Sequence, residues 1–376
     1  MNKIIAIITS GHSPFDERIY HKMSMTFIKS GFSVVIISST LAASYSDTNL
    51  NIIGFNANNL NKSEKIFKFK ELLERHAPDI IICCEPLPVI AAHKYKKSTR
   101  KMVTIISDIT EWYPENVALK LKGTGRLLTY IKLFLFNIYA TNLADRLIIG
   151  EKTKYKRYKF IAPFRRKEII GYYPVLDHFH YSPPPFNGEE LVLCYAGVIS
   201  FERGILNILN VAIRAAEQSP HIRFVLKIIG RFQYDNEEML FLDRIPAMAN
   251  LSIDMVPWGK YEEISHKVAN ADICLDLRNP TFVYRNSLPI KIFEYMACGK
   301  PVIYSDIAPV RKELSVDKFG FLVDPENTAE ISDIILNYIK QPELLLKHSK
   351  EARLQAEKYY NWGALENKLV DFVTAG

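Results

Sequence analysis

The chain has 376 residues, of which 48% are hydrophobic and 24% are charged, a composition typical of a soluble globular enzyme. It excludes a disordered, collagen-like or coiled-coil protein, and the length favours two domains. The formal net charge is +7, but residues 1–185 contain 27 Lys and Arg against 15 Asp and Glu (+12), and residues 186–376 contain 21 against 26 (−5). We expect the halves to have different partners, although a basic surface without a ligand explains the charge equally well.

The cysteines and the apolar segments indicate the cellular compartment in which the protein is expected. The five cysteines are odd in number and include no C-x-x-C pair, which argues against a disulfide framework or a cysteine zinc site and favours a reducing cytoplasm. The N-terminal apolar run Ile4–Ile8 is too short for a secretory signal. The most apolar later stretch, Leu127–Tyr139, has 13 residues with Lys132 among them, whereas a spanning helix needs about 20. We therefore expect a protein that does not cross a membrane.

The first half alternates runs rich in Ile and Val with helical patterns. The runs show little polar alternation, as in parallel strands that are covered on both faces. The predicted strands are Ile4–Thr9, Ser33–Ser38, Asp79–Cys83, Met102–Ser107 and Arg146–Ile149. Ile19, Met23 and Phe27 lie four residues apart and predict a helix that ends at Gly31, and a second helix is predicted over Lys62–His76.

The second half repeats this alternation. Its predicted strands are Leu191–Ala196, Phe224–Ile229, Leu251–Met255, Asp272–Leu277, Pro301–Tyr304 and Gly320–Val323. Apolar residues at helical spacing in 205–213 and 331–339 predict helices between them. The pattern indicates an α/β fold of two Rossmann-like, doubly wound domains. Three consecutive prolines, Pro183 to Pro185, place an interdomain linker in Tyr172–Glu190.

The strongest local signal is YRNSLPIKIFEYMACGKPVI at 284–303. Ser287 or Leu288 is predicted to cap a helix with Pro289 in its first turn, and Gly299 to end it. The start of this helix then lies in the loop after a strand, where free backbone N–H groups bind anions. Lys291 lies in the first turn, and Glu294, one turn further on, suits the hydroxyls of a nucleotide ribose. An ordinary capped helix with a solvated Lys and Glu explains the same pattern equally well.

This segment resembles the nucleotide-binding signature of family 4 glycosyltransferases of the GT-B fold, P-x-K-x-F-E-Y-M-A-x-G-x-P-V-I. Four further stretches fit, so the resemblance covers nearly the whole chain. They are His12–Ile19, Asp108–Pro114, Tyr195–Gly197 with Arg203-Gly204, and the Trp362 region. The resemblance implies an acceptor-side domain over residues 1–175 and a nucleotide-sugar domain over residues 176–359, facing each other across a cleft. A final helix at 360–376 is implied to cross back to the first domain.

In the second domain the resemblance implies a set of donor-binding residues. Glu294 matches the glutamate that binds the ribose, Leu288 and Ile290 are candidates for backbone donation to the pyrophosphate, and Gly197 lies in the matching glycine loop. Asn286 replaces the usual first glutamate of the family's pair, which puts the sugar of the donor in question.

Two cations in this domain are implied to act on the diphosphate. Arg203 matches the basic residue that stabilises the leaving diphosphate. The frequent second basic residue is Val198 here, and Lys291 is expected to supply the missing charge. The alternative for Arg203 is a surface residue at a helix start.

In the first domain Gly11 and His12 follow the first strand, where the family's loop approaches donor and acceptor. His12 is equally consistent with a structural histidine. Asp16 and Arg18 are better explained as a helix-start carboxylate and a local ion pair than as catalytic residues, although Asp16 stays an acceptor-side candidate.

The segment after the fourth predicted strand supplies further acceptor-side candidates. Thr110 replaces a common histidine of the family, and its hydroxyl can hydrogen-bond a sugar but not act as a base. Asp108 and Glu111 are candidates for contacts with acceptor or sugar. A hydrolytic pair of carboxylates is the alternative.

No Asp-x-Asp or His-x3-His spacing occurs, so we expect metal-independent transfer without a cofactor. Lys120, Lys122, Arg126 and Lys132 lie among apolar residues in 116–142, a pattern of helices that rest on anionic membranes. For Leu127–Tyr139 we favour the alternative, a core helix packed on both sides.

Together these features predict a retaining, metal-independent glycosyltransferase. It would use a nucleoside-diphosphate sugar and a glycan or lipid-linked acceptor in bacterial capsule, O-antigen or exopolysaccharide assembly. We expect it in the cytoplasm, peripheral on the inner face of the cell membrane, and without a nucleic-acid partner. The alternatives are a nucleotide-sugar epimerase or hydrolase of the same fold and a two-lobed binding protein without turnover. A Rossmann dehydrogenase fits least, because Gly123-x-Gly125 follows no predicted strand.

Overall fold

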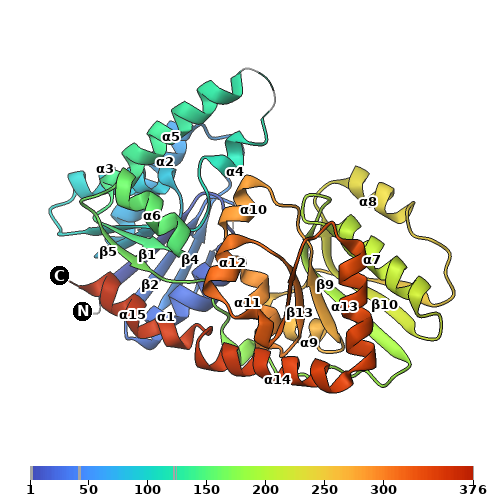
Figure 1. The fold of residues 1–376 in the computed structure, drawn as a ribbon. Coiled ribbons are helices and arrows are strands. Elements are labelled where there is room, and N and C mark those ends of the chain that lie inside the picture. The colour runs from blue at the N-terminus through green and yellow to red at the C-terminus, as the bar shows by residue number, and fades with distance from the viewer. Residues whose placement is uncertain (1–2, 41–43, 122, 124, 376) are drawn as a thin grey trace. The chain divides into compact units, whose positions relative to one another are not determined.

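The computed structural model describes residues 3–40, 44–121, 123 and 125–375, which fold as two compact units (Figure 1). Unit 1 runs up to Tyr172 and takes in the C-terminal residues from Gly363 onward. Unit 2 covers Tyr173–Trp362. The two boundaries lie three residues from the expected ones at 175/176 and 359/360.

Unit 1 is built on an eight-stranded sheet in the order β3-β4-β2-β1-β5-β6-β7-β8. All neighbours pair in parallel except β3 and β4, which are antiparallel. The strands are β1 (Ile4–Thr9), β2 (Ser33–Ser38), β3 (Ser44–Ser46), β4 (Leu50–Gly54), β5 (Ile80–Cys83), β6 (Thr104–Ile109), β7 (Arg146–Ile149) and β8 (Arg166–Ile169). The five predicted strands are therefore present. The sequence reading missed β3, β4 and β8, which lie toward the two edges of the sheet.

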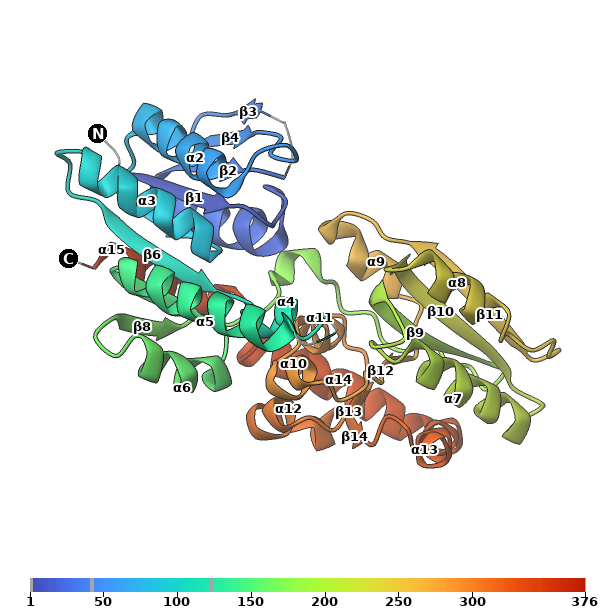
Figure 2. The same ribbon diagram turned by 90° about the horizontal axis from the view of Figure 1, so that it is seen from above.

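Helices cover both faces of this sheet. The α2, α3 and α5 helices lie side by side on one face, and α1 and α15 on the other (Figures 1 and 2). The helices of unit 1 are the π-helix η1 (Glu17–Ser24), α1 (Met25–Lys29), α2 (Lys62–His76), α3 (Pro86–Ser98), α4 (Glu115–Ala118), α5 (Gly125–Leu143), α6 (Lys152–Ile161) and α15 (Gly363–Thr374). The α2 helix has the predicted bounds, and Asn61 and Glu64 form a capping box at its start.

The first predicted helix forms as η1 followed by α1. Ile19, Met23 and Phe27 are buried, which explains their spacing, and Gly31 ends the element with a φ of +85°. The sequence pattern did not distinguish the π-helical turns from α-helix.

The α5 helix contradicts the expectation of a core helix packed on both sides. Leu127, Leu128, Ile131 and Leu135 are 45% to 66% exposed, whereas the helix residues that are buried are Asn137, Ala140 and Thr141. This helix therefore presents an apolar stripe to solvent. Lys122, one of the expected basic residues, lies outside the described residues. No helix in the described part of the chain combines the length and apolar character needed to span a bilayer.

The α15 helix is fastened to unit 1 through its C-terminal end. The Arg146 guanidinium donates to the carbonyl oxygens of Phe372 at 2.8 Å and Val373 at 3.1 Å. Near the start of the helix, Thr26 Oγ1 donates to Glu366 Oε1 at 3.2 Å. A cation at the last carbonyls of a helix complements its dipole, so this distant segment completes unit 1.

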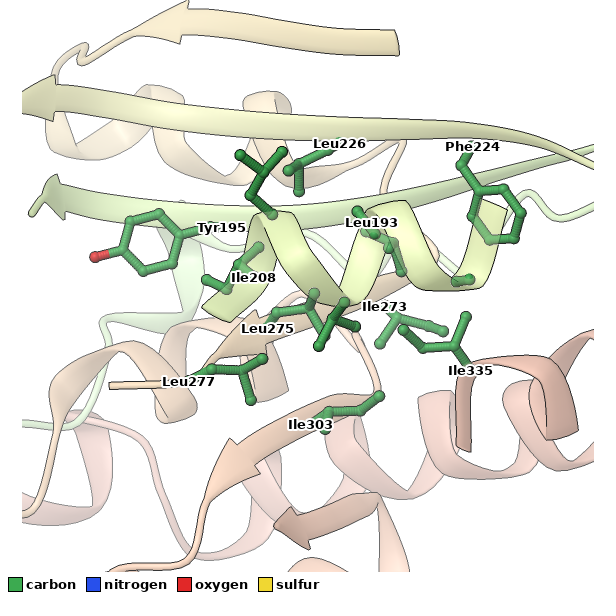
Figure 3. Packing of buried hydrophobic residues seen from close by; sticks show 14 of the residues in the cluster. Leu193, Tyr195, Ile208, Phe224, Leu226, Ile273, Leu275, Leu277, Ile303 and Ile335 are labelled. Atoms are coloured by element: carbon green, nitrogen blue, oxygen red, sulfur yellow. The ribbon is translucent and has the colours of Figure 1, made fainter. Parts of the chain in front are cut away.

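Unit 2 has a six-stranded, fully parallel sheet in the order β11-β10-β9-β12-β13-β14. All six predicted strands are present. Their bounds are β9 (Glu190–Ile199), β10 (Arg223–Phe232), β11 (Leu251–Pro257), β12 (Ile273–Asp276), β13 (Val302–Ser305) and β14 (Gly320–Val323). The side chains of Leu193, Leu226, Ile208 and Leu275 meet in the core between this sheet and α7 (Figure 3).

The helices of unit 2 connect these strands. They are η2 (Leu176–His178), α7 (Ile205–Gln218), α8 (Asp235–Leu242), η3 (Tyr261–Glu263), α9 (Ile264–Val268), α10 (Phe282–Asn286), α11 (Ile290–Ala297), α12 (Ala308–Glu313), η4 (Val316–Lys318), α13 (Thr328–Lys340) and α14 (Pro342–Lys358). The short α10 occupies the segment that we expected to be an open loop.

Gly204 is the position where the approach of α7 to the sheet is tightest. Its φ is +78°, and a Cβ atom there would lie 1.8 Å from the carbonyl oxygen of Leu277. A side chain would therefore strain the turn and push the backbone away from the end of β12.

We expect Gly204→Ala to lower the free energy of unfolding by about 3 kcal/mol or more. Gly188 is the matched control in the same unit, because its φ of +92° is similar and a Cβ atom there would meet nothing within 4 Å. Gly188→Ala should cost about 1 kcal/mol, the left-handed strain alone. Urea unfolding of both variants measures the difference. Equal losses would show that the contact with Leu277 is unimportant.

Candidate functional site

The start of α11 lies after the short α10 in unit 2. The helix begins at Ile290 with Pro289 as its N-cap, and no side chain caps it. Ser287, expected as a cap, instead donates from Oγ to the carbonyl oxygen of Val283 at 2.8 Å, and Leu288 is a buried residue of the core. The expected cap is therefore wrong. The first turn of α11 is left without a side chain that would compete with an anion.

Lys291 and Glu294 form an ion pair on the first turn of α11. Lys291 Nζ lies 2.8 Å from Glu294 Oε2, and the Glu294 side chain is only 2% exposed. A Cβ atom at Gly197 would lie 3.8 Å from Lys291 Cε, so the lysine stem runs past the end of β9. The structure thus brings Gly197, Lys291 and Glu294 together.

Trp258 adds an aromatic ring to this group. It follows β11, and Lys291 Nζ lies 4.5 Å from the centroid of its ring, a cation–π distance. The ring is 44% exposed. The sequence analysis missed this residue, although a Trp-Gly pair three residues after the predicted strand Leu251–Met255 was a signal that could have found it.

Arg203 lies beside a second aromatic ring. Its guanidinium carbon is 5.9 Å from the centroid of Tyr284, and the guanidinium of Arg278 lies 5.0 Å from that centroid. The Arg203 Nε atom is buried and has no hydrogen-bond partner in the described part of the chain. Such an orphaned donor is costly unless a ligand satisfies it.

Arg278 is itself fixed by buried groups. Its Nε donates to Asp276 Oδ1 at 2.7 Å, and Tyr304 Oη donates to Asp276 Oδ2 at 3.1 Å. Burial lowers the pKa of Arg278, but the paired Asp276 carboxylate outweighs it and raises that pKa well above its ordinary value. Arg278 therefore stays charged and holds Tyr284, and Tyr284 in turn positions Arg203. The sequence analysis did not single out this support.

Asn286 ends α10, and its Nδ2 donates to the carbonyl oxygen of Phe282 at 2.8 Å. It is partly exposed in the segment before α11. Ile290, the other expected backbone donor, is the first residue of α11.

In unit 1 a carboxylate that the sequence analysis missed organises the loop after β1. Glu85 accepts from Thr9 Oγ1 at 2.7 Å, from the backbone N–H of Ser10 at 2.7 Å and from that of Gly11 at 3.0 Å. His12 Nε2 lies 3.6 Å from Glu85 Oε1, and its Nδ1 lies 3.8 Å from Asp16 Oδ2. The Glu85 carboxylate thus contacts both the backbone of Gly11 and the side chain of His12.

Asp16 and Arg18 have separate roles. Asp16 caps η1 by accepting from the backbone N–H of Arg18 at 2.9 Å. The Arg18 side chain pairs with Asp108, with Nε to Oδ2 at 2.7 Å and Nη2 to Oδ1 at 2.9 Å. The expected helix-start carboxylate is confirmed, but the ion-pair partner of Arg18 is distant in sequence. Asp108 is only 1% exposed, and its two oxygens serve this buried pair, so its expected contact with acceptor or sugar stays a prediction.

Thr110 and Glu111 follow β6. The Thr110 carbonyl oxygen accepts from Tyr172 Oη at 2.8 Å and from the Lys154 ammonium. Burial lowers the pKa of Lys154, although Glu151 opposes this effect. Glu111 is exposed and accepts from Asn116 Nδ2. These backbone contacts fix the loop, and the Glu111 side chain lies at the surface.

The described residues include no group of three or more His, Cys, Asp and Glu side chains that could hold a metal ion.

Known proteins resemble this chain in two ways. Residues 180–355 match the model of the family described as Glycosyl transferases group 1. Unit 2 contains a glycosyltransferase domain. This finding confirms the expected enzyme class. No curated protein matches the chain in sequence.

Solved structures of low identity share the fold of the whole chain. Sucrose-phosphate synthase from Thermosynechococcus elongatus is 14% identical with a TM-score of 0.75, covering 99% of this chain and 98% of its own. Anabaena HepE in complex with UDP-glucose is 13% identical with a TM-score of 0.70, covering 99% and 100%. WaaG, a glycosyltransferase involved in lipopolysaccharide biosynthesis, is 13% identical with a TM-score of 0.71, covering 99% and 100%. These similarities confirm the α/β fold of two parallel-sheet domains of GT-B type.

We expect Arg18→Leu to lower the free energy of unfolding by about 3–5 kcal/mol, because it leaves Asp108 as a buried charge without its partner. Asp16→Ala is the control, since it removes only a helix cap and should cost about 1 kcal/mol. Urea unfolding measures these losses, and similar costs for both variants would contradict the structural role of the pair.

Proposed function

We propose that the protein is a retaining, metal-independent glycosyltransferase of family 4. It moves a sugar from a nucleoside-diphosphate sugar to a glycan or lipid-linked acceptor in the assembly of a bacterial surface polysaccharide, such as capsule, O-antigen or exopolysaccharide. The observation that carries the proposal is the Lys291–Glu294 pair beside Gly197, at the start of an uncapped helix in the glycosyltransferase domain. Anabaena HepE is solved with UDP-glucose, so we propose a UDP-sugar as the first donor to test.

In this proposal Glu294 accepts hydrogen bonds from the ribose hydroxyls. Lys291 then lies between two anions, the Glu294 carboxylate and the diphosphate. It supplies the positive charge of the family's second basic residue, whose position is occupied by Val198 here. The backbone N–H groups near Leu288 and Ile290 complete the diphosphate contacts. Asn286 lies close in sequence to this turn and is the candidate that contacts the sugar.

Arg203 supplies the second positive charge. Its unpartnered Nε is satisfied once a phosphate oxygen accepts from it. The Tyr284 ring contacts Arg278 as well as Arg203. It limits the motion of the Arg203 guanidinium before the ligand binds. A cation that is already in place stabilises charge as it develops without reorganisation.

The transfer step breaks the bond between the anomeric carbon and the diphosphate oxygen. The new bond forms from the acceptor hydroxyl to the same carbon and face, and the hydroxyl proton passes to the departing phosphate oxygen. No strong protein base is needed, which agrees with threonine at position 110. His12 and Glu111 are candidates for hydrogen bonds to the sugar or acceptor from unit 1.

Trp258 is proposed to stack on the base of the nucleotide. Its exposed ring is linked to Glu294 through Lys291, so a base attached to a ribose on Glu294 lies within reach of the ring. Base–aromatic stacking is worth about 1–3 kcal/mol.

We expect Glu294→Gln and Arg203→Ala each to weaken UDP binding by about 10- to 100-fold, through loss of charged hydrogen bonds. Arg203→Ala should in addition lower kcat by about 100-fold or more. Glu326→Gln, an exposed carboxylate in the same unit, is the matched control and should change neither. Calorimetric titration with UDP and an assay of nucleotide-sugar panels in the presence of a chelator provide the measurements.

The same assay separates the proposed reaction from its alternatives. Release of nucleotide only when an acceptor is present, with the chelator having no effect, supports transfer. Interconversion of the sugar, release without acceptor, or unchanged UDP binding in both variants would contradict the proposal.

Trp258 offers an independent optical test, because the chain has three Trp residues and the other two, Trp112 and Trp362, are 7% and 1% exposed. We expect UDP to quench the fluorescence of the wild type and of Glu326→Gln. Trp258→Phe should keep UDP affinity within about threefold but lose the quenching, whereas Trp258→Ala should weaken binding by about 5- to 100-fold. Unchanged affinity in Trp258→Ala would refute the stacking role while leaving Glu294 as the ribose ligand.

We further propose that the protein acts in the cytoplasm, on the inner face of the cell membrane. The support is the excess of basic residues in the first half and the exposed apolar stripe of α5.

A further inference from the structure

A second surface of unit 1 combines strong positive charge with exposed aromatic rings. Residues 152–167, which form α6 and the turn before β8, contain eight Lys and Arg and no Asp or Glu. Phe160 and Phe164, at the end of α6 and in the turn, are 84% and 94% exposed. A phenylalanine exposed to this degree loses the benefit of burial. Two of them in one basic segment form an apolar pair that a partner could cover.

Only part of the positive charge in this segment is neutralised within the fold. Lys154 Nζ lies 2.8 Å from Glu151 Oε1, and Arg157 Nη1 lies 2.8 Å from Glu115 Oε2. The side chains of Lys156, Lys159 and Arg166 are exposed. Burial and the nearby Lys159 lower the pKa of Lys167, which indicates that cations of this segment lie close together. An anionic partner would relieve this repulsion.

The turn that carries Phe164 is anchored to the end of α5. Asn142 Nδ2 donates to the carbonyl oxygen of Ile161 at 2.8 Å, and the Arg165 guanidinium donates to the carbonyl oxygen of Asn142 at 2.5 Å. The two phenylalanines are therefore presented by a backbone that is tied at both sides of the turn. This arrangement lowers the entropy lost when they bind.

We propose that residues 156–166 dock on an anionic lipid bilayer, with Phe160 and Phe164 inserted at the level of the headgroups. Lys156, Lys159 and Arg166 then contact lipid phosphates. Clusters of four to eight cations are attracted to anionic leaflets, and Phe side chains of basic interfacial segments bury themselves at the boundary of headgroups and acyl chains. A soluble polyanion would pair with the cations but would leave both rings in water, so the rings favour lipid. The inference deepens the peripheral location proposed above and names the segment that makes the contact.

The test is co-sedimentation of the full chain with vesicles of equimolar phosphatidylglycerol and phosphatidylcholine, and with vesicles of phosphatidylcholine alone. We expect binding to the anionic vesicles that weakens at high salt. Phe160→Ser/Phe164→Ser should lower the affinity by at least about tenfold. Lys156→Gln/Lys159→Gln should lower it by about 25-fold, at roughly fivefold for each charge. Phe67→Ser, which alters a 68% exposed ring on α2 of the same unit, is the matched control and should bind as the wild type does.

Three outcomes would overturn this inference. They are no binding to anionic vesicles at low salt, equal losses in Phe67→Ser and the double phenylalanine variant, and full retention of binding by the latter with competition by dextran sulfate. The last outcome would identify a polyanion-binding surface. Far-UV circular dichroism and urea unfolding of the same variants check that unit 1 is folded, and UDP titration without vesicles reports on the donor site of unit 2. Intact UDP binding with failed docking refutes this inference alone, whereas failed UDP binding by the wild type refutes the donor site instead.

Discussion

The donor-site proposal depends on one buried carboxylate and its lysine. A carboxylate that is 2% exposed is stable only when its charge is paired and hydrogen-bonded, and Lys291 at 2.8 Å supplies that partner. The pair can form because α11 lies against the end of β9, where Tyr295 Oη accepts from the backbone N–H of Ala196 at 2.8 Å. The absence of a side chain at Gly197 leaves room for the lysine stem. A ligand that binds here meets a carboxylate and a cation already held in place.

Aromatic rings stand beside both cations of this site. Lys291 lies over Trp258 and Arg203 over Tyr284. The Tyr284 ring limits the motion of Arg203 without neutralising it, whereas Lys291 is in addition paired with the Glu294 carboxylate. Arg278 shows the contrast, because Asp276 holds it directly and leaves it a supporting role. Unit 1 uses carboxylates instead: Glu85 binds the backbone of the loop after β1, and Asp108 holds Arg18.

Sequence reading performed best where a pattern is local. The bounds of β1, β2, β7 and α2 agree with the prediction, since apolar runs and a capping residue mark them in the sequence. It performed worst at the sheet edges, where β8 is the polar run Arg166–Ile169, held by β7 and by Lys368 of α15. The α5 helix was misjudged because an apolar stripe looks the same whether protein or solvent covers it. The motif led to Lys291 and Glu294, whereas Trp258 and Glu85 lie outside it, and nothing in the sequence shows that Tyr284 lies beside Arg203.

The sequence by itself determined the alternation of strands and helices, the two α/β units and the motif around α11. These follow from hydrophobic periodicity, from helix-ending glycines such as Gly31 and Gly299, and from a family motif. All three are local patterns of neighbouring residues. Only the tertiary structure decided which charges meet. Arg18 pairs with Asp108 across 90 positions of sequence, and Phe160 and Phe164 are left without cover. The pairing of charges and the exposure of side chains depend on which segments fold against each other. The spacing of residues along the chain does not show which distant residues come close in the folded protein.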